Sequence, residues 1–266
     1  MEINAWLAET IERLGQAGIG SARLDALILL EDETGKDRSY LLAHPEMVLP
    51  ATSVAKLNKQ IVQRSTHRPL AYIRGFTEFY GRRFKVNQRV LEPRPESETM
   101  IELLKQLKLD KPVIADVGTG SGAIGITAAL EIHTAEVDLY DIDSSCLAVA
   151  RHNSLMHELH LHAYKRDLLS RPVRDYDVIL ANLPYVPNDW QINEAAGMEP
   201  RLAIFGGKDG LDLYRRMFAQ LGKMEDPAHS VLTEALPPQH NALQQIGEAH
   251  GYNLKIAQDF IQVFEL

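Results

Sequence analysis

The chain has 266 residues, of which 45% are hydrophobic and 24% charged, a balance typical of a globular protein with one large or two small domains. No apolar run approaches the roughly 18 residues that span a bilayer. The first residues, Met1-Glu2-Ile3-Asn4, lack the basic and apolar regions of a signal peptide. A single cysteine, Cys146, excludes an internal disulfide and fits a reducing compartment. We therefore expect a cytoplasmic protein without a membrane partner. We also expect a monomer, although none of these features determines the oligomeric state.

The formal net charge of −8 is unevenly distributed. Residues 1–75 carry 9 basic and 9 acidic side chains, whereas the rest of the chain carries 19 basic and 27 acidic ones. Nucleic-acid enzymes usually present a basic surface that neutralises phosphates. The acidic second part therefore argues against duplex or structured RNA as the main substrate, and we expect no direct nucleic-acid substrate.

Residues 1–75 are predicted to form a small helical domain, because apolar residues recur there at helical spacing and no strand pattern appears. In residues 76–92, Tyr80-Gly81 with flanking aromatic residues indicates a β-hairpin with a tight turn. Pro93 and Pro95 exclude a central strand, and Pro95 followed by acidic residues is typical of a helix start. A third region, 93–266, then begins.

From Val113 onward, strand patterns alternate with helix patterns. We expect strands at 113–117, 137–140, 159–164, 176–181 and 230–235, with further strand character over 254–264. Helices are expected between them. This alternation predicts an α/β fold with a mostly parallel sheet covered by helices on both faces.

The first candidate site is the loop between the first of these strands and its helix, Asp116-Val117-Gly118-Thr119-Gly120-Ser121-Gly122. Glycines here let the backbone turn sharply and approach a ligand closely. Asp141 lies 21 residues beyond Gly120, at the end of the next strand, where a carboxylate can accept hydrogen bonds from ribose hydroxyls. Asp167-Leu168, after the third strand, can meet an adenine with an acceptor and an apolar edge.

Dinucleotides and S-adenosylmethionine both fit this pattern. An oxidoreductase would need a second nucleotide-binding half and a proton donor near the later strands, and the sequence offers no clear one. The acid before the first glycine, Asp116, suits an adenosylmethionine site. The histidines at 152, 157, 160 and 162 lack the spacing and partners of a metal site, so no metal is expected.

The second candidate site is Asn182-Leu183-Pro184-Tyr185, which follows the buried strand 176–181. Ligands bind at this end of the strands in open α/β sheets. The Asn182 side-chain oxygen and the Leu183 carbonyl can accept the two N–H groups of a planar nitrogen, while Pro184 restrains the backbone. Tyr185 can pack on the flat face of the acceptor group. This pattern favours methyl transfer to an amide or exocyclic amine, with positioning as the main contribution.

Taken together, several motifs resemble the protein-(glutamine-N5) methyltransferases, which include the enzyme that modifies peptide chain release factors. Besides the Asp116–Gly122 loop, the similar segments are Arg68–Ile73, Glu78–Gly81, Pro93–Glu96, Glu199–Ala203 and Gly206–Leu211. The resemblance implies a helical substrate-recognition domain, a linking hairpin and a Rossmann-like class I methyltransferase domain with seven strands. It also implies methylation of the glutamine in the Gly-Gly-Gln motif of class-1 release factors. Gly118, Gly120, Gly122, Asp141 and Leu168 would then bind S-adenosylmethionine, and residues 182–185 the glutamine.

One departure keeps alternatives open. The family usually has two prolines after the asparagine, and Leu183 replaces the first. Asn-Leu-Pro-Tyr also resembles the loop of ribosomal RNA adenine-N6 dimethyltransferases, although those enzymes carry their helical domain after the catalytic one. A glutamine methyltransferase of a ribosomal protein, an RNA or DNA adenine methyltransferase and a non-catalytic adenosylmethionine-binding module remain alternatives.

Overall fold

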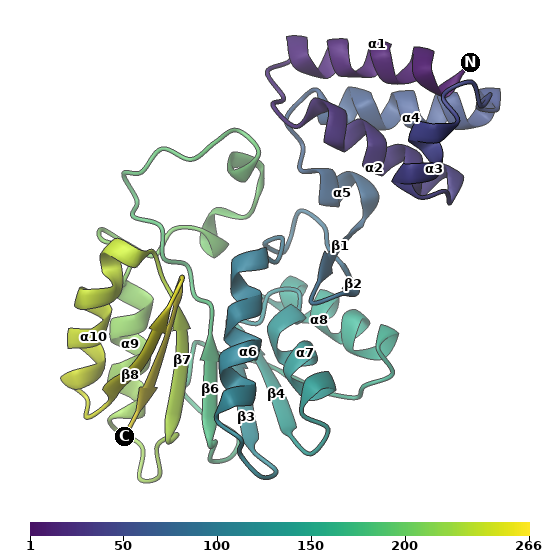
Figure 1. The fold of residues 1–266 in the computed structure, drawn as a ribbon. Coiled ribbons are helices and arrows are strands. Elements are labelled where there is room, and N and C mark those ends of the chain that lie inside the picture. Colours follow the sequence, from purple (N-terminus) through teal and green to yellow (C-terminus); the bar gives the residue numbers. More distant parts are fainter. The chain divides into compact units, whose positions relative to one another are not determined.

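The computed structural model describes residues 1–266, and the chain divides into two compact units. One unit comprises residues 1–75 with 193–198, and the other comprises residues 76–192 with 199–266 (Figure 1). No helix combines the length and the apolar character that crossing a membrane requires.

The first unit is helical and has its own apolar core. Its helices are α1 (Ile3–Gln16), α2 (Ala22–Thr34), α3 (Arg38–Ala43), α4 (Ala51–Arg64) and α5 (Leu70–Arg74). The indole nitrogen of Trp6, which is buried, donates to Asn58 Oδ1 at 2.9 Å. A buried ion pair between Arg64 and Asp25, at 2.6 Å, connects α4 to α2. These contacts fix how the amphipathic helices pack on one another.

The second unit begins with the expected hairpin, β1 (Phe76–Phe79) and β2 (Arg82–Lys85), which pair antiparallel. Tyr80 and Gly81 at its tip both have positive φ, 52° and 70°. Two consecutive left-handed residues are what a two-residue type I′ hairpin turn needs. The hairpin packs its buried Phe79 and Phe84 into the core of this unit.

A seven-stranded sheet forms the centre of the second unit and confirms the predicted α/β class. The strands are β3 (Val113–Val117), β4 (Glu136–Asp141), β5 (His162–Lys165), β6 (Val178–Ala181), β7 (Ser230–Glu234), β8 (Asn253–Gln258) and β9 (Ile261–Glu265). Their order is β5-β4-β3-β6-β7-β9-β8. The first five in this order pair in parallel, and β9 and β8 join antiparallel at the far edge.

Helices cover both faces of the sheet, as Figure 1 shows. They are α6 (Glu98–Gln106), α7 (Ala123–Glu131), α8 (Ser144–Met156), α9 (Asp212–Leu221) and α10 (His240–Glu248). An apolar core lies on each face of the sheet, and successive residues of β3 point into opposite cores. Ile114 belongs to the core with α6 and α7, and Ala115 to the core with residues of α9 and α10. This two-sided burial explains why the parallel strands are continuously apolar.

The strand order reverses between β3 and β6. From β3 the chain builds outward through β4 to β5, and it then returns to place β6 and β7 on the other side of β3. Connections therefore leave the carboxyl ends of β3 and β6 in opposite directions and open a crevice between them. Ligands of open α/β sheets bind at such a switch point.

Candidate active site

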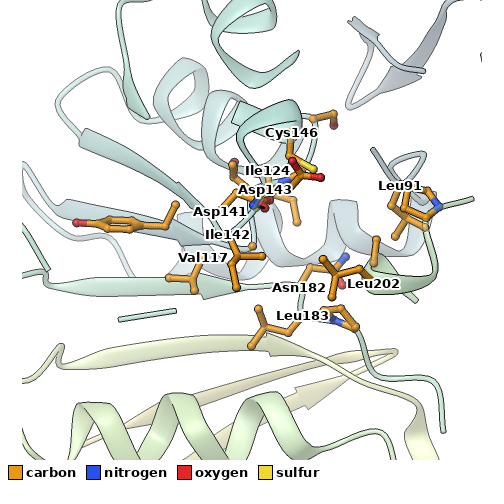
Figure 2. A pocket seen from close by; sticks show the side chains of 18 of the residues that line it. Leu91, Val117, Ile124, Asp141, Ile142, Asp143, Cys146, Asn182, Leu183 and Leu202 are labelled. Atoms are coloured by element: carbon orange, nitrogen blue, oxygen red, sulfur yellow. Dashed lines mark hydrogen bonds between the residues drawn. The ribbon is translucent and has the colours of Figure 1, made fainter. Parts of the chain in front are cut away.

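A cavity of about 230 Å³ opens at this switch point. That is far more than the roughly 10–15 Å³ that one water molecule requires. All residues that line it belong to the second unit. Figure 2 shows Asp141 and Ile142, from the end of β4, around the same hollow as Asn182 and Leu183, with Leu91 and Leu202 toward its right side.

The glycine loop follows β3 in a tightly wound conformation. Gly118, Gly120 and Gly122 all have positive φ, at 76°, 54° and 84°. A Cβ on Gly118 would lie 2.9 Å from the side chain of Leu183, so glycine is required there by backbone conformation and by space. Gly118, Gly120, Thr119 and Ser121 line the cavity. Gly122 does not, and a side chain at that position would collide with α7 and α8.

Asp116 organises this loop from beneath. It is buried and does not line the cavity. Its Oδ2 accepts hydrogen bonds from the Thr119 hydroxyl at 2.6 Å and from the Gly125 N–H at 2.9 Å. Burial raises the pKa of Asp116 to about 6, and these two hydrogen bonds oppose that rise. Asp116 therefore lies in the predicted loop, but its hydrogen bonds are with the loop and the first turn of α7.

Asp141 ends β4 with its carboxylate at the cavity wall. Its Oδ2 accepts from the Gly120 N–H at 3.0 Å and its Oδ1 from the Asp143 N–H at 2.8 Å. Burial raises the pKa of Asp141, although the backbone N–H groups favour the ionised form. Each carboxylate oxygen keeps a further lone pair, so the group can accept from two adjacent hydroxyls.

Apolar side chains next to Asp141 complete this half of the cavity. Ile142 is 49% exposed, unusual for a large aliphatic residue beside a buried strand. Leu168 is held with a positive φ of 52°, which is strained for a leucine. Asp167, just before it, forms an ion pair with Arg216 at 2.5 Å. A diol acceptor beside the exposed Ile142 and the buried Leu168 fits a nucleoside, which supports the predicted placement of an adenosyl group here.

Asn182 directly follows β6, and hydrogen bonds hold both Asn182 and the next residue, Leu183. The Asn182 side-chain nitrogen donates to Ser97 Oγ and to Glu234 Oε2, both at 2.9 Å. The Leu183 N–H donates to the Tyr214 hydroxyl at 3.1 Å, and the Leu183 side chain is buried. No hydrogen bond from the protein reaches Asn182 Oδ1 or the Leu183 carbonyl oxygen. The acceptor loop, defined as residues 182–185, thus keeps two oxygens available beside the cavity.

Pro184 lines the cavity, whereas Tyr185 does not. The Tyr185 hydroxyl donates to Glu234 Oε1 at 3.1 Å, and its carbonyl accepts from Gln239 Nε2 at 2.8 Å. Gly206 and Gly210 pack beneath the same backbone, where any Cβ would run into the carbonyl oxygens of Pro184 and Tyr185. The acceptor loop is therefore rigidly supported from three segments of the chain.

Sequence reasoning missed two polar residues of the site. Ser97 ends the short 3-10 turn Pro95–Ser97, and Glu234 ends β7; both are buried and both contact Asn182. Glu234 could have been found, because it is an acid at the carboxyl end of a strand in the same sheet. Ser97 carried no such signal. Arg94, beside Ser97, pairs with the buried carboxylate of Glu199 at the cavity rim.

Comparison with known proteins gives the family. A family model described as the PrmC N-terminal domain matches residues 5–75, and one described as the methyltransferase small domain matches residues 95–198. A release factor glutamine methyltransferase of Koribacter versatilis is 36% identical over 84% of this chain and 82% of its own length. One of Coxiella burnetii is 38% identical over 71% and 70%.

Solved structures agree on the fold. A methyltransferase from Pyrococcus furiosus has a TM-score of 0.51 at 17% identity, covering 81% of this chain and 98% of that chain. The hMettl16 catalytic domain, solved in complex with an RNA hairpin, has a TM-score of 0.53 at 12% identity, covering 80% and 81%. The second unit therefore has the Rossmann-like methyltransferase fold, which by itself does not decide the substrate. Together with these relatives, these observations place the chain in the release factor glutamine methyltransferase family.

Proposed function

We propose that this protein methylates the side-chain amide nitrogen of the glutamine in the Gly-Gly-Gln motif of class-1 peptide chain release factors. The observation that carries the proposal is the acceptor loop. Both hydrogens of the Asn182 amide are engaged by Ser97 and Glu234, so that its oxygen stays available beside the Leu183 carbonyl. Two fixed acceptors match the two N–H groups of a primary amide.

The protein is a methyltransferase whose cofactor is S-adenosylmethionine. When bound, S-adenosylmethionine supplies a methyl group on a positively charged sulfur. We propose that the loop from Gly118 to Ser121, the Asp141 carboxylate and the region of Asp167 and Leu168 hold it. Gly122 and Asp116 support the loop from behind through packing and hydrogen bonds.

Orientation of the acceptor nitrogen is the main contribution proposed for this chain. The lone pair of an amide nitrogen is delocalised, so that it is a weak nucleophile unless it is aimed at the methyl group. Asn182 Oδ1 and the Leu183 carbonyl would accept its two hydrogens and fix the plane of the amide. The same oxygens would stabilise positive charge that develops on nitrogen. No general base is required before transfer, because the extra proton can leave afterwards.

Tyr185 was predicted from the sequence to pack on the acceptor group, and we propose a smaller role for it. Its hydroxyl is engaged by Glu234, and the residue is absent from the cavity lining. We propose that packing of its ring against the acceptor amide, if substrate binding brings them together, is secondary to its support of the loop. Pro184, which does line the cavity, restrains the backbone that carries the Leu183 carbonyl.

We further propose that residues 1–75 recognise the protein substrate, that the 76–92 hairpin links the two parts, and that 93–266 carry out methyl transfer. The match of residues 5–75 to a family-specific amino-terminal model supports this division. We also propose that the protein acts as a monomer. The natural location of such an activity is the cytoplasm.

The test uses labelled S-adenosylmethionine and four acceptors: a class-1 release factor, the same factor with its Gly-Gly-Gln glutamine changed to alanine, an adenine-containing RNA, and ribosomal protein. We expect label only in the unchanged release factor. Equal labelling of both factors would overturn the glutamine assignment. Label in RNA would favour the adenine-N6 alternative that Leu183 suggests, and label only in ribosomal protein would favour the other glutamine substrate. A matched Asn182→Ala variant should keep cofactor binding and lose most of its transfer activity.

A further inference from the structure

Glu234 is a buried acid without a cation. It ends β7, is fully buried, and no lysine, arginine or histidine pairs with it. Removing a carboxylate from water without a counter-charge costs free energy, and an apolar residue at the end of β7 would avoid that cost. Buried ionisable groups of this kind concentrate where chemistry needs them.

All side-chain partners of Glu234 belong to the acceptor loop or to its support. Oε2 accepts from Asn182 Nδ2 at 2.9 Å, and Oε1 accepts from the Tyr185 hydroxyl at 3.1 Å. Ser97 also hydrogen-bonds to Glu234, and it accepts the second hydrogen of the Asn182 amide at 2.9 Å. One carboxylate therefore contacts the first and the last residue of the acceptor loop.

The charge of Glu234 decides which end of the Asn182 amide faces the cavity. An ionised carboxylate only accepts hydrogen bonds, so that it selects the NH₂ group and rejects the oxygen. The opposite orientation would place two oxygens in contact at 2.9 Å, the distance that now separates Nδ2 from Oε2. It would also present N–H groups, instead of an acceptor, to the N–H groups of the substrate.

We propose that Glu234, as a carboxylate, is a positioning residue that fixes the Asn182 amide with its oxygen toward the acceptor nitrogen. This inference rests on the proposed function, because it assigns Asn182 Oδ1 to the substrate. The hydrogen bond from Asn182 to a charged acceptor also polarises the amide and strengthens its oxygen as an acceptor. The role is indirect, since Glu234 does not line the cavity.

Protonation should abolish this selection. A neutral Glu234 can donate to Asn182 Oδ1, which stabilises the reversed amide. Burial raises the pKa of Glu234, and Glu96 adds to the rise, whereas hydrogen bonds from Ser97, Tyr185 and Asn182 oppose it. From α9, the Tyr214 hydroxyl reaches only the backbone carbonyl of Glu234. Methyl transfer should therefore decline on the acid side as this carboxylate gains its proton.

The kinetic test compares wild type, Glu234→Gln, Asn182→Ala and the double variant, with Glu265→Gln on neighbouring β9 as the control. Losing a hydrogen bond to a charged group predicts a fall in kcat of about 10- to 150-fold in Glu234→Gln. Cofactor affinity should stay near wild type, and the acid limb of the pH profile should disappear. In the Asn182→Ala background, Glu234→Gln should add little further loss. Independent multiplicative losses, or an unchanged acid limb, would overturn the proposal.

A second measurement does not depend on the acceptor. In ¹⁵N-labelled protein, the Asn182 side-chain NH₂ signals, identified by their absence in Asn182→Ala, should exchange slowly with water and shift on acidification. Both properties should be lost in Glu234→Gln and kept in Glu265→Gln. Rapid exchange in wild type would refute the positioning role. Failure of the proposed function gives a different result, in which wild type does not label release factor at all.

Discussion

Changing Asp141 to asparagine tests the cofactor half of the site. Each Asp141 oxygen accepts one backbone N–H, from Gly120 at 3.0 Å and from Asp143 at 2.8 Å, and keeps one lone pair for a ligand hydroxyl. Asparagine replaces one oxygen with an NH₂ group. One backbone N–H then faces a donor, and one ligand hydroxyl loses its acceptor.

Each hydrogen bond to a charged group contributes about 1.5–3 kcal/mol. Losing one with the ligand should therefore raise the Kd for S-adenosylmethionine about 10- to 150-fold. Because burial raises the pKa of Asp141, wild-type affinity should also weaken on acidification as the carboxylate is protonated. The Asp141→Asn variant should lack this pH dependence.

Isothermal titration calorimetry with S-adenosylmethionine measures both effects. The control is Asp110→Asn, an exposed acid outside the cavity lining, which should bind like wild type. A Kd for Asp141→Asn within about twofold of wild type, less than one hydrogen bond contributes, would refute the assignment of this carboxylate to the ribose.

Three further substitutions probe the loops. Gly118→Ala places a Cβ at φ 76° and 2.9 Å from the Leu183 side chain, so it should lower Tm and weaken cofactor binding, with backbone strain alone costing about 1–2 kcal/mol. Asp116, with its pKa raised from 3.8 to about 6, contributes stability that is fully present below pH 3.8 and lost as pH rises through about 6. In differential scanning fluorimetry, Asp116→Asn should therefore lose less Tm than wild type as pH rises across that window; an equal loss would contradict the shift. Leu183→Pro removes the N–H that donates to Tyr214 at 3.1 Å and a buried side chain, but keeps the carbonyl. It should lower Tm while kcat stays within about tenfold of wild type, and loss of kcat at unchanged Tm would contradict the carbonyl's role.

The fold was largely predictable because local patterns agreed with the final packing. The apolar run 113–117 became a strand buried on both faces, and Tyr80-Gly81 became a hairpin turn with two positive φ angles. The third strand was wrong at its edges: 159–164 was expected and His162–Lys165 is observed. This strand lies at the edge of the sheet and is only half buried, so its ends lack the continuous apolar pattern of the central strands.

Some residues of the site could be identified from the sequence, whereas others are recognised only through tertiary contacts. Asp141 was found from its spacing after the glycine loop, and the structure places it on the cavity wall. Ser97 and Glu234 lie 85 and 52 residues from Asn182 in the sequence, and no short motif joins them. Their role appears only when β6, β7 and the turn at 95–97 are brought together. Hydrogen-bond partners that fix a side chain's orientation are set by that assembly.

The charges at the cavity rim sharpen the argument from composition about the substrate. Four arginines, Arg89, Arg94, Arg166 and Arg216, line the cavity. Arg94 is paired with Glu199, and Arg216 with Asp167. Arg166 donates to the carbonyl oxygens of Arg171 and Lys165. Phosphate groups that contacted Arg94 or Arg216 would have to displace these carboxylate partners, which costs part of the affinity that such contacts normally provide. A neutral peptide segment entering toward Asn182 would leave them in place. The ion pairs of Arg94 and Arg216 thus support a protein amide as the acceptor, even though the acceptor loop alone would suit an adenine amine equally well.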